Sequence, residues 1–186
     1  MKKSILTSFA LVLFALGASA QVVTYPNLVQ TYKQKVQMVA TAVTTDGTGG
    51  GGGGTGGTGG TTVDLAQVDF AFNTAAHYAD GISGKVGHNF LITSTSPWLL
   101  QVKAETDLFT ALTTSGSDIS HNKLAWALAS DGTYTSLSTD FAAVKSGSLG
   151  SPLTPGHDFT VYYKLNPGAV APDTYSMNVI YTLSVQ

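Results

Sequence analysis

The sequence contains no cysteine and no arginine, and its only glutamate is Glu105. Without cysteine the fold can have no disulfide bond and no thiol chemistry, so core packing alone has to stabilise it. Without arginine, and with its lysines scattered, the chain offers no basic patch of the kind that nucleic acid binds. A surface so poor in charge has to be covered mainly by Thr, Ser, Asn and Gln.

The chain also has little continuous apolar sequence, apart from residues 5–16. This run follows two lysines and precedes the small residues 18–20, which is the order of a signal peptide and its cleavage site. It is shorter than the roughly 20 residues of a membrane span, so a retained anchor is the less favoured alternative. We expect residues 1–20 to be removed. The mature chain would then begin at Gln21, pass through the periplasm and reach the cell surface or the medium.

Most of the remaining sequence alternates apolar and polar residues in short segments. A period of two predicts strands with one buried face, and Gly, Pro and Asp turn signals separate the segments. Such a series predicts an all-β, antiparallel β-sandwich, with a closed barrel as the alternative. Residues 124–130 fit a strand or a helical turn, and residues 139–147 fit a helical turn or a bridging loop. The clearest inward faces are Tyr175, Met177, Val179, Tyr181, Leu183 and Val185; Phe159, Val161, Tyr163 and Leu165; and Trp98, Leu100 and Val102.

Residues 44–62 contain 11 of the 21 glycines, and threonine makes up most of the rest, so this stretch cannot build a core. Before it, residues 21–43 alternate enough to supply one or two strands, although Pro26 prevents one unbroken central strand. The chain is therefore divided into a signal peptide (1–20), an N-terminal strand segment (21–43), a flexible linker (44–62) and a β-sandwich domain (63–186).

The glycine-rich stretch does not match a phosphate-binding loop. Such a loop needs Gly-Lys-Ser/Thr and a following helix, whereas here Thr-Thr-Val-Asp and a predicted strand follow. We predict no cofactor.

The side chains that could carry catalysis or hold a metal are dispersed. Ser120 and His121 are neighbours that would point to opposite faces of a strand, and the carboxylates of Asp64, Asp69, Glu105 and Asp107 fit solvated edge charges. We predict no catalytic site, no metal site and no enzyme activity, although a secreted hydrolase remains a third hypothesis. The histidines are spaced too far apart for a local zinc motif: His77, His88, His121 and His157.

Exposed aromatic side chains could instead form a sugar-stacking platform. Core packing is the competing interpretation, and the alternation favours it for most of these residues, while Tyr162 should point outward from its strand. A carbohydrate- or surface-binding adhesin module would have to use Tyr78, Asp80, Asn122 and Tyr134. The aromatic residues in question are Trp98, Trp126, Tyr134, Tyr162 and Tyr163.

The pattern "FAFN…HYADGI…NFLITSTSPWLLQVKAE…YYKLNPG…APDTYSMNVIYTLSVQ", within residues 68–186, resembles exported bacterial Ig-like sandwich proteins of the fimbrial and coat type. The resemblance implies an Ig-like sandwich with a structural or adhesive role at the cell surface and no catalysis. The chain departs from chaperone–usher pilins because it has no cysteine and has Val185 as its penultimate residue.

Together these features predict a structural subunit of an extracellular filament or surface layer, with self-association as the expected interaction. Residues 21–43 could add as a β-strand to the sheet of a neighbouring copy. They could equally pair within their own chain, since long loops add little closure entropy. The sequence leaves both open, and the adhesin module is the alternative function.

Overall fold

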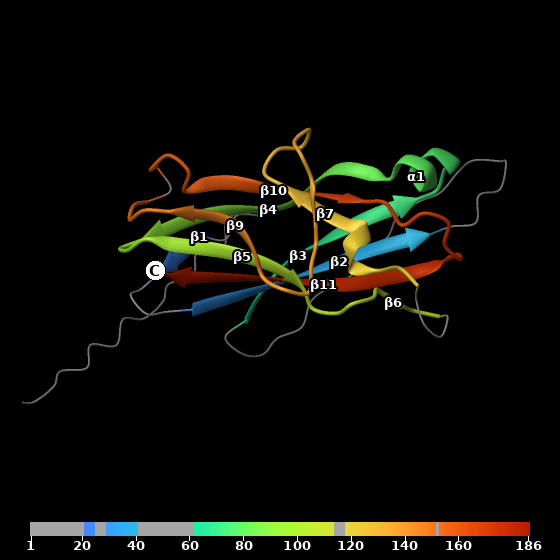
Figure 1. Ribbon diagram of the computed structural model, residues 1–186, viewed down its shortest axis with the longest axis horizontal. Coiled ribbons are helices and arrows are strands. Elements are labelled where there is room, and N and C mark those ends of the chain that lie inside the picture. The colour runs from blue at the N-terminus through green and yellow to red at the C-terminus, as the bar shows by residue number, and fades with distance from the viewer. Residues whose placement is uncertain (1–20, 25–28, 41–61, 114–117, 152) are drawn as a thin grey trace, which may run out of the picture.

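The computed structural model describes residues 21–24, 29–40, 62–113, 118–151 and 153–186. In these residues nearly all regular structure is strand, and the strands form two sheets around one core (Figure 1). The predicted signal peptide and nearly all of the predicted linker lie outside the described residues. The elements are β1 (Gln21–Thr24), β2 (Val29–Ala40), β3 (Thr62–Phe72), α1 (Ala75–Asp80), β4 (Ile82–Ser94), β5 (Trp98–Ala104), β6 (Thr110–Ala111), the short 3-10 helix η1 (His121–Lys123), β7 (Leu124–Ala127), β8 (Thr135–Ser136), β9 (Ala142–Gly147), β10 (Asp158–Leu165) and β11 (Asp173–Val185).

The sandwich expected from the sequence is present, and most neighbouring strands are antiparallel. In the described residues, sheet A has the strand order β1-β4-β10-β7-β8. Sheet B has the order β3-β2-β11-β5-β9, with β6 also beside β11. Two neighbouring pairs run parallel instead, β1 with β4 and β2 with β3. Hydrophobic alternation indicates which side chains are buried, but it carries no information about the direction of the neighbouring strand.

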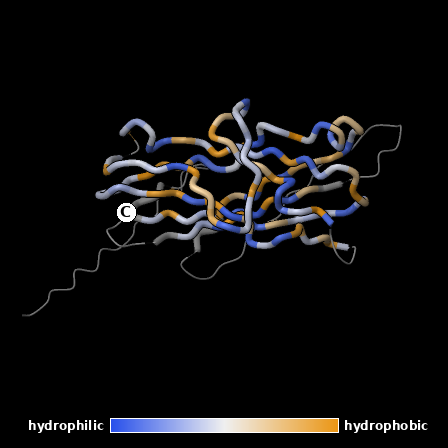
Figure 2. The backbone as a smooth tube through the Cα atoms, in the orientation of Figure 1, coloured by the Kyte–Doolittle hydropathy of each residue, from blue (hydrophilic) through white to orange (hydrophobic). Residues whose placement is uncertain are grey.

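The core lies between the two sheets and contains the predicted inward faces. The residues predicted to face inward on β5, β10 and β11 are buried, and Val185 is the one whose side chain is not described. The alternation is visible in Figure 2 as orange and blue segments that follow one another along the strands. Trp98 of sheet B stacks on Phe159 of sheet A, with ring centroids 6.2 Å apart and planes 2° from parallel. The aromatic residues predicted for the core therefore connect the two sheets.

Three local elements, β7, β9 and α1, were left open by the sequence-based predictions or differ from them. Residues 124–127 form the strand β7, one of the two alternatives for that segment. Residues 142–147 form the strand β9, so the prediction of a helical turn or bridging loop over residues 139–147 was wrong. The strand β9 pairs only with β5 among the described strands, and Val144 is its one buried side chain, so the alternation there is weak. The helix α1 was not expected. It begins at Thr74, whose hydroxyl accepts a hydrogen bond from the His77 amide, as N-cap residues do.

The N-terminal segment is divided between the two sheets. β1 lies beside β4 in sheet A, and β2 lies inside sheet B between β3 and β11. Pro26 falls between the two strands, as its lack of a backbone donor requires. Within the single chain, β2 therefore belongs to the same sandwich as the strands that follow the glycine-rich stretch.

Candidate functional site

The most distinctive site is the position of β2 in sheet B, between β3 and β11. We call this position the β2 seat, and it faces the inward side chains of sheet A. β2 pairs antiparallel with β11 from Val29 opposite Ser184 to Ala40 opposite Asp173. On its other edge it pairs parallel with β3. Both backbone edges of β2 are therefore hydrogen-bonded. β3 is the first strand after the glycine-rich stretch and β11 is the last strand of the chain, so the seat lies where the two ends of the sandwich domain meet.

Four described side chains of β2 point into the core: Tyr32, Gln34, Val36 and Met38. Three of them are largely apolar, and each such side chain stabilises the folded state by about 1.5–3 kcal/mol when it is fully buried. The Tyr32 ring meets Phe90 of sheet A edge to face, with centroids 6.3 Å apart. The strand is thus an integral part of the core.

Gln34 is the polar exception on this face, and it is fully buried. Its Nε2 atom donates hydrogen bonds to the carbonyl of Ala66 on β3 (2.9 Å) and to the carbonyl of Gly87 on β4 (2.7 Å). Its Oε1 atom accepts a hydrogen bond from the Tyr163 hydroxyl of β10 (3.0 Å). One amide therefore uses both donors and its acceptor, and it joins β2 to strands of both sheets.

The two carbonyls that Gln34 binds lie at irregularities of strand pairing. On β3, two residues, Ala66 and Gln67, fall between the partners of Gln34 and Val36. On β4, Gly87 is the extra residue between the partners of two consecutive β10 residues. An extra residue of this kind is left out of the ladder, so its carbonyl needs another donor when it is buried. Gln34 supplies that donor at both places.

The Tyr163 ring packs closely against Gly87, which has no side chain to obstruct it. A Cβ atom at this glycine would lie 2.6 Å from the ring. The Tyr163 hydroxyl lies 2.6 Å from the Tyr181 hydroxyl of β11. Because Tyr163 gives its single proton to Gln34, Tyr181 is the donor in this pair. Burial raises the pKa of both tyrosines well above the usual value, so both hydroxyls stay protonated and the chain of hydrogen bonds stays intact.

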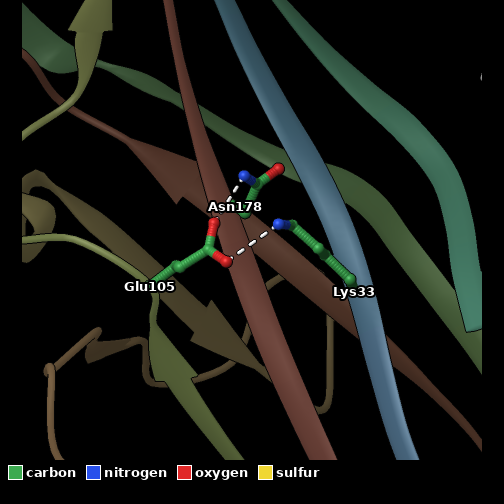
Figure 3. A network of polar contacts seen from close by, with 3 residues as sticks. All are labelled: Lys33, Glu105 and Asn178. Carbon is green, nitrogen blue, oxygen red and sulfur yellow. Dashed lines mark hydrogen bonds and ion pairs between the residues drawn. The ribbon is translucent and has the colours of Figure 1, made fainter. Parts of the chain in front are cut away.

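On the outer face of sheet B, a second contact holds β2 beside β11. Lys33 donates to Glu105 Oε1 at 2.8 Å, and the side-chain amide of Asn178 donates to Glu105 Oε2 at 2.6 Å (Figure 3). The hydrogen bond from Lys33 is the main reason that the pKa of Glu105 is lowered. The ion pair is partly exposed, and such pairs contribute at most about 1 kcal/mol. Its value lies in fixing the position of β2 along β11.

The four histidines lie at separate places in the fold, His77 in α1 and the other three on β4, in η1 and before β10. His157 is buried, where it accepts a hydrogen bond from Trp98 Nε1 and lies 2.9 Å from the Ile92 carbonyl. His88 is also buried, and burial lowers its pKa to about 4. His121 contacts the Asp107 carbonyl at the surface. Within the described ranges, no three His, Asp or Glu side chains are grouped so that they could hold a metal ion.

The four residues singled out for an adhesin come from three places in the fold, and the two tyrosine hydroxyls already make hydrogen bonds. Tyr78 of α1 donates to the Phe72 carbonyl, and its ring packs on that phenylalanine. Tyr134, after β7, accepts from the Gly84 amide and donates to the Ser130 carbonyl. Asp80 ends α1, and Asn122 lies in η1. As predicted, Tyr162 is more exposed than Tyr163.

The chain matches no protein-family model and no curated protein. In the part of the chain that the structure describes, no helix is long and apolar enough to span a membrane.

The sequence analysis missed the central residue of the site. It identified the strand character of residues 21–43, but not Gln34. The available signal was a single amide on an otherwise apolar alternating face, at the second of the positions 32, 34, 36 and 38. The three groups that the amide binds come from β3, β4 and β10, and nothing in the local sequence places them together.

Proposed function

We propose that the protein is a structural subunit of an extracellular filament or surface layer, in which residues 21–43 of one subunit complete the sandwich of the next. The observation that carries the proposal is the position of β2, an interior strand joined to its parallel neighbour β3 through a long glycine-rich stretch. On this proposal the sandwich is of the Ig-like type and β2 is the donor strand. The signal-peptide pattern of residues 1–20 supports export to the cell surface.

The length of the connection permits both arrangements. The connection between two parallel neighbours has to run back along the length of the strand. Here it starts at Ala40, which lies beside Phe72 at the end of β3, and it must reach Thr62 at the start of β3. Ten residues of strand separate these points, or about 33 Å. A Gly-rich coil of 21 residues has a root-mean-square span of about 25 Å and a limit of about 70 Å. A subunit can therefore fill its own β2 seat or that of a neighbour.

Exchange of β2 between subunits needs no new interface. The hydrogen bonds of β2 with β3 and β11, and those of Gln34, are the same whether the strand comes from the same chain or from another. Such an exchange is a low-cost route to assembly, and because the contact is head to tail it generates open fibres when it does not close into a ring. Entropy favours the chain's own strand, since two segments joined in one chain have an effective concentration of up to about millimolar for each other.

Single-cysteine variants test exchange directly, because the chain has no other thiol. Thr31 lies opposite Thr182 in the β2–β11 pair. A mixture of Thr31→Cys chains and Thr182→Cys chains should form disulfide-linked heterodimers after incubation at high concentration. Thr31→Cys mixed with Ser136→Cys, which lies on β8 in the other sheet, is the matched control and should not. Absence of the heterodimer at millimolar concentration would contradict strand exchange.

Electron microscopy then tests the filament itself. The mature chain should form fibres, whereas a chain carrying both Thr31→Cys and Thr182→Cys, oxidised while dilute, has β2 locked in its own seat. The locked chain should stay monomeric until a reductant is added. Fibres that form equally well from the locked chain would show that assembly uses another surface. If neither form assembles, the filament role is refuted.

A further inference from the structure

We infer that Gln34 is the specificity-determining residue of the β2 seat: it sets the register of the inserted strand and restricts the occupant to this chain's own sequence or a second copy of it. The selection of a second copy rests on the proposed function, whereas the setting of register does not. The supporting observation is that the buried Gln34 amide makes three hydrogen bonds: to two backbone carbonyls at bulges and to the Tyr163 hydroxyl.

The seat presents a particular set of hydrogen-bonding groups inside an apolar groove. The carbonyls of Ala66 and Gly87 are acceptors, and the Tyr163 hydroxyl donates to Gln34 Oε1, which can only accept. A strand that fits must bring two donors and one acceptor to one point. A primary amide carries these groups without charge. Asparagine has the same groups on a side chain one methylene shorter, so glutamine suits the distance.

The apolar side chains of β2 do not set the register by themselves. A slip of one residue would turn every inward side chain outward, so it is already excluded. A slip of two residues keeps Tyr32, Val36 and Met38 facing inward, and it moves the strand by about 6.7 Å. The fully buried Gln34 amide would then leave its partners, and the buried Tyr163 hydroxyl and the carbonyls of Ala66 and Gly87 would lose theirs. Each such loss shifts an equilibrium by roughly ten-fold or more.

The same reasoning applies to foreign strands. Alternating apolar segments are common in exported β-proteins, and many would satisfy the backbone edges of β3 and β11. A strand with an aliphatic residue at the position of Gln34 would leave the same groups unpaired. The β2 seat therefore favours a strand with the glutamine amide over a foreign strand that leaves these groups unpaired. Such a penalty against the wrong partner adds to specificity from shape.

Cysteine pairs within one chain can read the register. Thr31→Cys with Thr182→Cys reports the native register, while Thr31→Cys with Ile180→Cys or with Ser184→Cys reports slips of two residues in either direction. In the otherwise native chain the native pair should dominate. Gln34→Met, which keeps length without polarity, should lower the ratio of native to slipped disulfide at least ten-fold. Gln37→Met, an outward glutamine on the same strand, is the matched control and should leave the ratio unchanged.

An unchanged ratio in Gln34→Met would overturn the inference. Should that variant fail to fold, Tyr163→Phe carries the test, because it keeps the ring and leaves the Gln34 Oε1 atom without its donor. The ratio should then fall several-fold, and an unchanged ratio would again refute the role of Gln34. The ratio of native to slipped disulfide reports the register whether the disulfide forms within one chain or between two chains. Failure of strand exchange therefore appears as the absence of linked oligomers and is distinguishable from failure of this inference.

Donor competition tests the choice of partner. Thr31→Cys chains with and without Gln34→Met, distinguished by isotope labelling, compete for Thr182→Cys chains. We expect the chain with Gln34 to be captured at least ten-fold more often in disulfide-linked heterodimers. Equal capture of the two donors would refute the selection of a second copy through this residue.

Discussion

Acid should destabilise the protein through His88. This side chain is buried on β4, its Nε2 atom has no hydrogen-bond partner, and its ring meets Phe90 edge to face. Burial lowers the pKa of His88 to about 4, whereas a solvated histidine titrates near 6.5. Between these values the unfolded chain binds a proton that the folded protein excludes. The contribution to stability is therefore fully present above pH 6.5 and is lost as the pH falls toward 4.

The two pKa values determine the size of this effect. Proton linkage lowers the free energy of unfolding by about 2.5 kcal/mol between pH 7.5 and 4.5, and the loss approaches a limit of about 3.4 kcal/mol well below pH 4. With a slope of about 2 kcal/mol per molar urea, the unfolding midpoint should fall by about 1.2 M over this range. Urea titrations at several pH values measure it, with the fluorescence of the buried Trp98 and Trp126 as the signal.

The variant His88→Phe is the control, because it fills the site with a ring that does not titrate. Other groups, Glu105 among them, contribute to the acid response of both proteins, so the difference between the two isolates His88. We expect the variant to lose about 2.5 kcal/mol less than the native chain between pH 7.5 and 4.5. If the free energy of unfolding falls by the same amount in both proteins, burial of His88 is not the cause of the acid sensitivity.

Three substitutions test the packing and the polar contacts, each by urea unfolding at pH 7.5. Gly147→Ala should cost about 1–3 kcal/mol because its Cβ atom would lie 2.5 Å from the Trp98 indole, and a native-like midpoint would contradict the tight packing. Gln34→Leu should cost about 2–4 kcal/mol, the balance of two unpaired carbonyls against added apolar burial, while Gln37→Leu on the outer face should change stability by less than about 0.5 kcal/mol. Glu105→Gln should cost less than about 1 kcal/mol, and this small loss should shrink further in 1 M salt if the ion pair is its source.

Much of the architecture was accessible from the sequence because the strongest signals are local. The alternation of β11, β10 and β5 identifies strands and their buried faces, since the inward residues are apolar and most of their neighbours are polar, with Leu99 and Ile180 as exceptions. The edge strand β9 was harder to identify, because an edge strand that buries only Val144 has little alternation to show. The helix α1 is six residues long, too short for a helical period to be recognised.

The β2 seat could not be predicted in the same way, because its properties depend on residues that are distant in sequence. The extra residues in β3 and β4 that leave two carbonyls unpaired are features of strand pairing, and composition does not reveal them. Gln34 falls on the apolar face of its strand, but the sequence does not show which groups its amide binds. The same holds for Lys33, whose partner Glu105 lies at the end of another strand.

The order in which β2 and its partner are synthesised has a consequence for folding time. β2 is among the first strands made, yet β11, which pairs with its whole length, is the last. Contacts so distant in sequence form slowly. Until the C-terminal strand is in place, β2 is a half-paired strand with no stable position. On the proposed strand exchange, copies that fold side by side in that interval would compete for one another's strands. Crowding at the moment of folding, more than the stability of the finished fold, would then decide between monomer and chain of subunits.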